Sequence, residues 1–155
     1  MNTQTFAAPV TPSAISPLDR LAPLAFPLVR ITTGLLLIPH GAQKLFGWFG
    51  GHGLVATGQY FESTLGMSPG LVFATLAGLI EFAGGLALVL GLLTRPVALA
   101  LAVFMGVALS VHVPNGFFWT AGGIEYPLMW GLVALAIFLR GGDRFSLDRR
   151  LGLRI

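Results

Sequence analysis

The feature that most constrains this chain is a set of four long apolar segments separated by short polar stretches. The segments cover about residues 26–46, 71–93, 96–113 and 124–139, and the fourth is the shortest. At a rise of about 1.5 Å per residue, a helix of about 20 residues crosses the roughly 30 Å hydrocarbon layer of a bilayer. The sequence therefore predicts an all-α membrane protein, an antiparallel bundle of four transmembrane helices within residues 24–141.

The composition excludes several other classes of protein. Hydrophobic residues make up 55% of the 155 residues and charged residues 10%, whereas the surface of a soluble domain needs about 25–35% charged residues. A disordered chain is poor in apolar residues, so that class is excluded as well. The chain has no cysteine, which excludes disulfides and thiolate chemistry. The net charge of +3 comes from scattered basic residues, so we expect no nucleic-acid partner.

The basic residues predict the orientation in the membrane. Eight arginines fall at one end of the predicted bundle, and Lys44 alone falls at the other. The eight are Arg20, Arg30, Arg95, Arg140, Arg144, Arg149, Arg150 and Arg154. By the positive-inside rule both termini are cytoplasmic. We expect residues 1–23, which hold four prolines and no signal peptide, to be a disordered cytoplasmic tail and residues 142–155 a basic one. Arg30 is expected to extend toward the lipid head groups.

The two outer loops, 47–70 and 114–123, are rich in aromatic residues, as is typical of a membrane interface. Apolar residues at helical spacing in the first loop predict a short periplasmic interfacial helix. Ala98, Ala102, Gly106 and Ser110 follow one another at four-residue spacing. We interpret this stripe of small residues as a packing surface within the bundle rather than an oligomer contact.

Ionisable residues in the apolar segments are the candidates for function, because a charge at membrane depth costs about 2.5–3.5 kcal/mol even on insertion-based scales. Glu81 lies near the middle of the second segment. His40 and Lys44 share one face of the first segment, and His112 and Glu125 lie at the outer ends of the third and fourth. One interpretation is structural, with Lys44 paired to Glu125 and His40 to Glu81.

The second interpretation is a polar cavity open to the periplasm that binds a head group or passes protons. Glu81 and His40 form its floor and exchange protons, while Lys44, His112, Glu125 and Trp48 bind the substrate. His40 and His112 could instead ligate a haem, but their predicted depths differ by about 6 Å, which argues against it. We expect no metal site and no intrinsic cofactor.

Several motifs together resemble the DoxX family of small bacterial four-helix inner-membrane proteins. They are PHGAQKLFGWFGG at 39–51, GLIEFAGGLALVLGLLTRP at 78–96, His112, GGIEYP at 122–127 and FSLD at 145–148. The positions that match the family pattern are Gly41, Lys44, Gly47, Glu81, Gly84, Gly85, Gly91, Arg95 and His112. The resemblance implies the bacterial inner membrane and a link, known for several members, to membrane oxidoreductases and to quinone-dependent oxidation of reduced sulfur compounds. It transfers no catalytic assignment.

The function predicted from these observations is a membrane subunit of a quinone-linked or other oxidoreductase complex. Its site would bind a quinone head group or protons, and a redox partner protein or a second copy of the chain would complete the complex, since the sequence holds no redox-centre motif. Two alternatives remain open. One is a non-catalytic anchor or assembly factor, and the other is a permeation unit for a small solute or ion.

Overall fold

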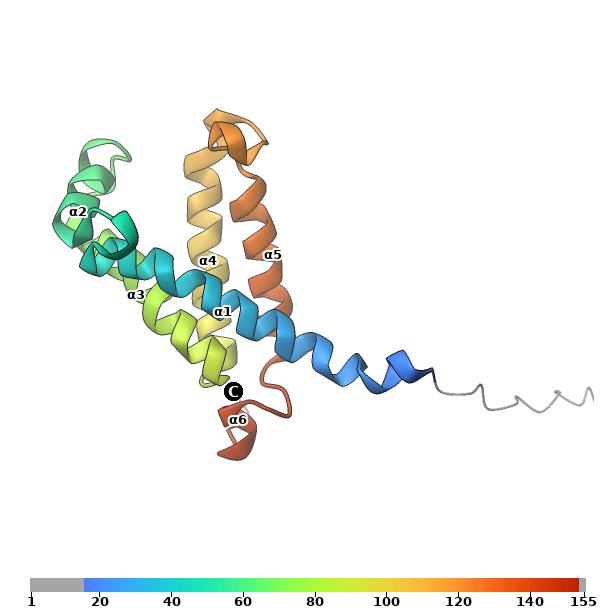
Figure 1. Cartoon of the computed structure of the whole chain (residues 1–155). Helices are drawn as coiled ribbons and strands as arrows, with labels where there is room; N and C mark the ends of the chain where they lie inside the picture. Colours follow the sequence, from blue (N-terminus) through green and yellow to red (C-terminus); the bar gives the residue numbers. More distant parts are fainter. Residues whose placement is uncertain (1–15, 154–155) are drawn as a thin grey trace, which may run out of the picture.

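The computed structural model describes residues 16–153, and within that range the regular structure is entirely helical (Figure 1). The α-helices are α1 (Ala22–Phe46), α2 (Gly53–Ser63), α3 (Gly70–Leu90), α4 (Thr94–His112), α5 (Glu125–Arg140) and α6 (Leu147–Arg150). Short 3-10 helices lie at Pro17–Arg20, Trp48–Gly50, Val113–Asn115 and Trp119–Ala121. The prediction of an all-α fold is confirmed for this part of the chain.

Among the residues that the structure describes, three helices are long and apolar enough to cross a membrane. They are Ala22–Phe46, Gly70–Leu90 and Thr94–Asn115, with mean hydropathies of 1.5, 2.0 and 2.1. Their outer faces carry many large exposed apolar side chains, among them Leu35, Leu76 and Val103, so lipid is the solvent that these helices require. α5 has 16 residues and reaches about 24 Å, so its crossing of the membrane stays a prediction, as does a periplasmic position of α2.

The N-terminal boundary differs from the prediction. Residues 1–15 of the expected disordered tail lie outside the described residues, but residues 16–23 are folded. The Ser16 hydroxyl accepts a hydrogen bond from the backbone of Leu18 and caps a 3-10 helix, and α1 then begins at Ala22. Pro23 lies in the first turn of α1, where a proline is tolerated because its missing N–H would have no partner there.

The helices associate as two closely packed pairs joined by the α3–α4 hairpin. α1 crosses α3, and α4 runs antiparallel to α5 beside it (Figure 1). The buried core between the pairs is apolar and consists of Leu37, Leu88, Ala98, Leu101, Met105, Ala134 and Ile137. Its residues come from all four long helices, so each of these helices has one face in the core.

Glycines bring α1 and α3 into backbone contact. A Cβ atom built on Gly85 would lie 2.8 Å from the carbonyl oxygen of Gly34, and one on Gly78 would lie 2.6 Å from the side chain of Leu45. The predicted packing stripe on α4 is wrong beyond its first turns, because Gly106 has no atom within 4 Å of such a Cβ and Ser110 is exposed. Close helix packing in this fold therefore uses α1 and α3.

Arg30 is buried, with 1% of its surface exposed, and the prediction that it extends toward lipid head groups is wrong. Its Nε donates to Asp143 Oδ2 at 2.8 Å. Its Nη1 donates to the carbonyl oxygens of Leu88 and Val89 near the C-terminal end of α3. Because a helix leaves its last carbonyls without partners, this arginine both pairs with Asp143 and caps α3.

The segment after α5 folds back on the α3–α4 turn and does not extend away as a tail. Asp148 Oδ1 accepts from the backbone N–H of Leu93 at 2.7 Å, and its Oδ2 accepts from Thr94 at 2.8 Å. Gly91 ends α3 in the left-handed conformation, with φ of 67°. Asp148 thus caps the start of α4, as an N-cap residue would, and holds the C-terminal segment at this end of the bundle.

Candidate functional site

The centre of the candidate site is an ion pair between Lys44 of α1 and Glu81 of α3. Lys44 Nζ lies 2.9 Å from Glu81 Oε1 and 2.6 Å from Oε2. The Glu81 side chain is 6% exposed and that of Lys44 is 24% exposed. Glu81 is therefore the more buried partner of the pair, and Lys44 the more accessible one.

The contact between the two helices explains why Lys44 reaches Glu81. Gly41 lies against the backbone of α3, because a Cβ built on it would overlap the N atom of Phe82 and lie 2.8 Å from the carbonyl oxygen of Gly78. Lys44 and Glu81 each follow one of these glycines by three residues, so both lie on the facing sides of the two helices. Because α1 and α3 run antiparallel, the long Lys44 side chain extends back toward the N-terminus of α1 to reach Glu81. Small residues at the crossing thus set the distance between the charges.

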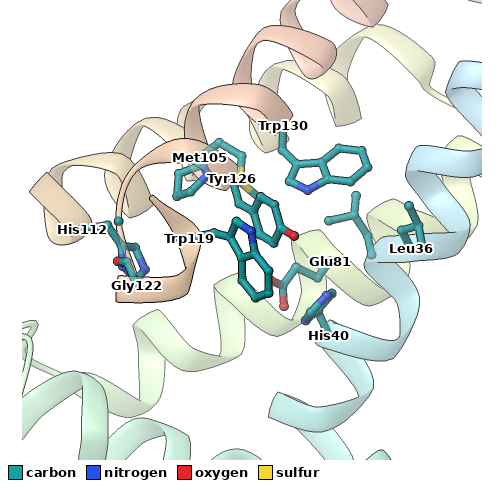
Figure 2. Close-up of a pocket in the computed structure, with 12 residues that line it drawn as sticks. Leu36, His40, Glu81, Met105, His112, Trp119, Gly122, Tyr126 and Trp130 are labelled. Carbon is teal, nitrogen blue, oxygen red and sulfur yellow. The ribbon is translucent and has the colours of Figure 1, made fainter. Parts of the chain in front are cut away.

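A cavity of about 350 Å³ opens on one side of this pair. His40 and Glu81 lie close together at one end of it, beneath the rings of Trp119 and Tyr126 (Figure 2). Trp119 and Tyr126 are stacked with their ring centroids 5.4 Å apart and an interplanar angle of 5°. The cavity therefore combines flat aromatic walls with a polar floor, and its volume lies in the range of small-molecule sites, about 300–1,000 Å³.

His112 lies at the other end of the cavity, and the loop before α5 fixes its ring. Its Nδ1 is 2.6 Å from the carbonyl oxygen of Gly122. A carbonyl oxygen only accepts hydrogen bonds, so Nδ1 carries a proton and Nε2 is left for a ligand or a proton. His112 also borders a second cavity, so its ring stands between the two.

The second cavity, about 240 Å³, lies on the Lys44 side of the ion pair. Glu81, Met105 and His112 border both cavities. Tyr60 and Phe61 of α2 form part of its wall, together with side chains of α4. The helix expected in the loop 47–70 is thus present at Gly53–Ser63 and covers Lys44.

Four of the six predicted site residues border the two cavities, and the other two do not. Lys44 and Glu81 are paired, and His40 and His112 line the same cavity. The structural pairing predicted for Lys44 with Glu125 is wrong, because Lys44 binds Glu81.

The other two candidates lie outside both cavities. Glu125 instead accepts a hydrogen bond from the backbone N–H of Trp119 at 3.0 Å and thereby fixes the loop. Trp48 is 56% exposed, and its ring lies against Phe46.

Sequence reasoning missed the aromatic walls. Trp119 was expected in the interfacial aromatic belt, while Tyr126 and Trp130 were not assigned to the site. Tyr126 and Trp130 are four residues apart on α5, and this spacing, which places two side chains on one helix face, was the available signal. Within residues 16–153, no three histidine or acidic side chains gather in a way that could hold a metal ion.

The sequence of this chain matches a known protein family. The family model for DoxX matches residues 25–119. This chain belongs to the DoxX family. The DoxX match covers α1 to α4 and includes His40, Lys44, Glu81 and His112, whereas Tyr126 and Trp130 on α5 lie beyond it.

Two relatives align with most of this chain. An uncharacterized protein of Haemophilus influenzae is 31% identical over 86% of this chain and 95% of its own length. An uncharacterized membrane protein of Mycobacterium tuberculosis is 32% identical over 81% of this chain and 80% of its own length. No solved structure matches this chain at a significant level.

Proposed function

We propose that this DoxX protein is a membrane subunit that binds the head group of a quinone in the cavity beside Glu81 and exchanges protons with it. A redox partner protein carries the electrons, because the sequence holds no redox-centre motif. The observation that carries the proposal is the Lys44–Glu81 ion pair, which lies between two cavities in a chain surrounded by lipid. The resemblance to DoxX members that act with quinones supports the choice of ligand.

A buried ion pair between two membrane helices is costly to form. Removing two charges from water costs several kcal/mol each, and such a pair contributes little to stability relative to apolar residues of the same volume. Ionisable residues inside membrane segments therefore mark ligand sites and proton pathways. In this chain the two charged groups border cavities instead of being enclosed by apolar side chains.

The cavity fits a flat ring with polar atoms at its edge. Trp119, Tyr126 and Trp130 offer aromatic faces against which a planar ring stacks. His40 and Glu81 lie where the ring edge would reach them (Figure 2). A bound quinone supplies redox chemistry that is coupled to proton transfer.

Glu81, Lys44 and His40 have different roles in the proposed proton transfer. The Glu81 carboxylate accepts a proton at Oε1 or Oε2, and Lys44 stabilises its charged form. His40 is exposed and lines the cavity, where its imidazole can take up and release a proton as a general acid or base. The arginine distribution supports an inner-membrane orientation with both termini cytoplasmic, so protons would leave on the periplasmic side.

Tryptophan fluorescence tests this proposal directly. The chain has three tryptophans, of which Trp119 and Trp130 line the cavity and Trp48 does not. We expect a short-tailed ubiquinone to quench the emission of the purified full-length protein saturably, and the Trp48→Phe variant to retain this quenching. Glu81→Gln and His40→Ala should each weaken binding about tenfold, the value of one hydrogen bond to a charged group.

Glu62→Gln is the matched control, because Glu62 is an exposed carboxylate of α2 outside the cavity. It should bind the quinone as the unmodified protein does. Equal affinity of Glu81→Gln, His40→Ala and Glu62→Gln, measured at a temperature at which all three variants are folded, would contradict the proposal. That outcome would mean that the ion pair has a structural role and would favour the alternative that the protein is a non-catalytic anchor or assembly factor.

A further inference from the structure

A third cavity, distinct from the Glu81 site, lies where α4 begins and α5 ends. Its volume is about 470 Å³, and Arg95, Arg140 and Arg149 line it together with Gly141, Gly142 and Asp148. The three arginines come from α4, α5 and α6. Residues far apart in the sequence thus place three guanidinium groups around one space.

These guanidinium groups have no carboxylate partner among residues 16–153. The two ion pairs in that range are Arg30–Asp143 and Lys44–Glu81. Asp148, the acidic residue in the cavity wall, uses its two oxygens on the backbone N–H groups of Leu93 and Thr94. The cavity is therefore strongly positive, and an anion would be stabilised there.

The backbone is shaped to admit these side chains. Gly141 has a φ of 76°, and a Cβ built on it would lie 2.8 Å from Nε of Arg95 and 3.2 Å from its Cζ. Arg95 is the second residue of α4, in its first turn. The Arg140 guanidinium is held 5.2 Å from the ring centroid of Phe26.

The surroundings of the cavity identify the kind of anion. It lies at the ends of helices that span the membrane, at the level of lipid phosphates. Leu153 lines the cavity and is exposed, as are Leu93 and Leu139, the sequence neighbours of the helix ends that carry Arg95 and Arg140; apolar side chains here suit acyl chains. We propose that this cavity binds a phosphate group, that of an anionic phospholipid such as phosphatidylglycerol, through Arg95, Arg140 and Arg149.

Lipid binding by the purified full-length protein tests the proposal. Short-chain phosphatidylglycerol is titrated into protein in neutral detergent, and bound lipid is counted by native mass spectrometry. Phosphatidylcholine and inorganic phosphate are the comparison ligands. We expect one retained phosphatidylglycerol and an affinity about tenfold higher than for phosphatidylcholine. Arg149→Gln should weaken binding about tenfold, since each guanidinium donates charge-assisted hydrogen bonds.

Arg150→Gln is the matched control. Arg150 neighbours Arg149 on α6, is also exposed, and does not line the cavity, so its loss should leave the affinity unchanged. Equal effects of the two variants would show attraction by general surface charge and overturn the proposal. Inorganic phosphate that binds as tightly as phosphatidylglycerol would overturn the assignment to a lipid. Both variants alter exposed side chains, and an unchanged melting temperature confirms their folding.

Discussion

Substitution of Asp143 with asparagine removes the charge that the buried Arg30 guanidinium faces. The two side chains are 1% and 4% exposed, and Nε lies 2.8 Å from Oδ2. Loss of one partner from a buried ion pair costs about 3–5 kcal/mol, because the other charge is left without compensation. Arg30 retains its hydrogen bonds to the carbonyl oxygens of Leu88 and Val89 in this variant. We therefore expect a loss of stability at the lower end of that range, about 3 kcal/mol.

This cost is measurable as a shift in melting temperature. For a chain of this size, 1 kcal/mol corresponds to about 2–4 °C, so Asp143→Asn should melt about 6–12 °C lower at neutral pH. Thermal unfolding in detergent, followed by tryptophan emission, gives the value. Asp19→Asn is the matched control, because Asp19 is exposed in the first 3-10 helix, and we expect it to change the melting temperature little.

The same pair predicts how stability depends on pH. Burial opposes the charged form of Asp143, but the hydrogen bonds from Arg30 and from the backbone of Phe145 outweigh it and hold the pKa of this carboxyl below its ordinary value. As the pH falls, the Asp143 carboxyl takes up a proton in the unfolded chain before it does so in the folded protein. The contribution of this carboxylate to the free energy of unfolding is therefore complete above the unfolded pKa of about 3.9. It is lost as the pH falls through the lower pKa of the folded protein.

The difference between the unmodified protein and Asp143→Asn should therefore shrink on acidification below about pH 4. Melting of Asp143→Asn at the same temperature as the unmodified protein at neutral pH would refute the reasoning. It would mean that the C-terminal segment does not dock on α3 and that Arg30 is solvated, as the sequence alone predicts.

Three further predictions follow from the packing and the caps. Gly85→Leu should destabilise the protein strongly, because a Cβ there overlaps α1, whereas Gly106→Leu should be tolerated, because no atom lies within 4 Å of a Cβ there. Thermal melting of both variants tests this difference. Equal melting temperatures would count against the α1–α3 contact. Asp148→Ala removes the cap of α4 and should cost about 1–2 kcal/mol in the same assay; unchanged melting would show that the cap is not formed. Lys44→Met leaves Glu81 buried without its partner and should destabilise the protein by about 3 kcal/mol more than the double variant Lys44→Met/Glu81→Leu does. The reverse order of melting temperatures would argue against the pair.

The helices were predictable from the sequence because hydropathy depends on local composition. The segment predicted at 71–93 is α3 at Gly70–Leu90, and the segment at 96–113 is α4 at Thr94–His112. The role of Arg30 was not predictable in this way. Its partner Asp143 is 113 residues away in the sequence, and only the docked C-terminal segment brings the two together.

Four ionisable residues that line the two cavities, His40, Lys44, Glu81 and His112, could be picked out from the sequence, but the pairing of Lys44 with Glu81 could not. His40 and Lys44 lie on one face of α1, so the sequence allowed either to contact Glu81. In the structure Lys44 Nζ lies 2.6 Å from Glu81 Oε2, a contact that depends on the close approach of α1 and α3 at Gly41 and Gly78. The aromatic walls depend on the loop before α5, which returns through hydrogen bonds from Ile124 and Glu125 to Gly116 and Phe117. That loop turns Trp119 toward Tyr126, and no local pattern indicates it.

The most direct test of the central claim is to map where a photoreactive quinone labels the protein. Illumination of the membrane-embedded, full-length chain with an azidoquinone, followed by peptide mass spectrometry, identifies the labelled residues. The account predicts label on the stretch that contains Trp119, Tyr126 and Trp130, and its loss when unlabelled quinone competes. Label confined to the lipid-facing side of α3 and α4, near Phe73 and Val103, would contradict it.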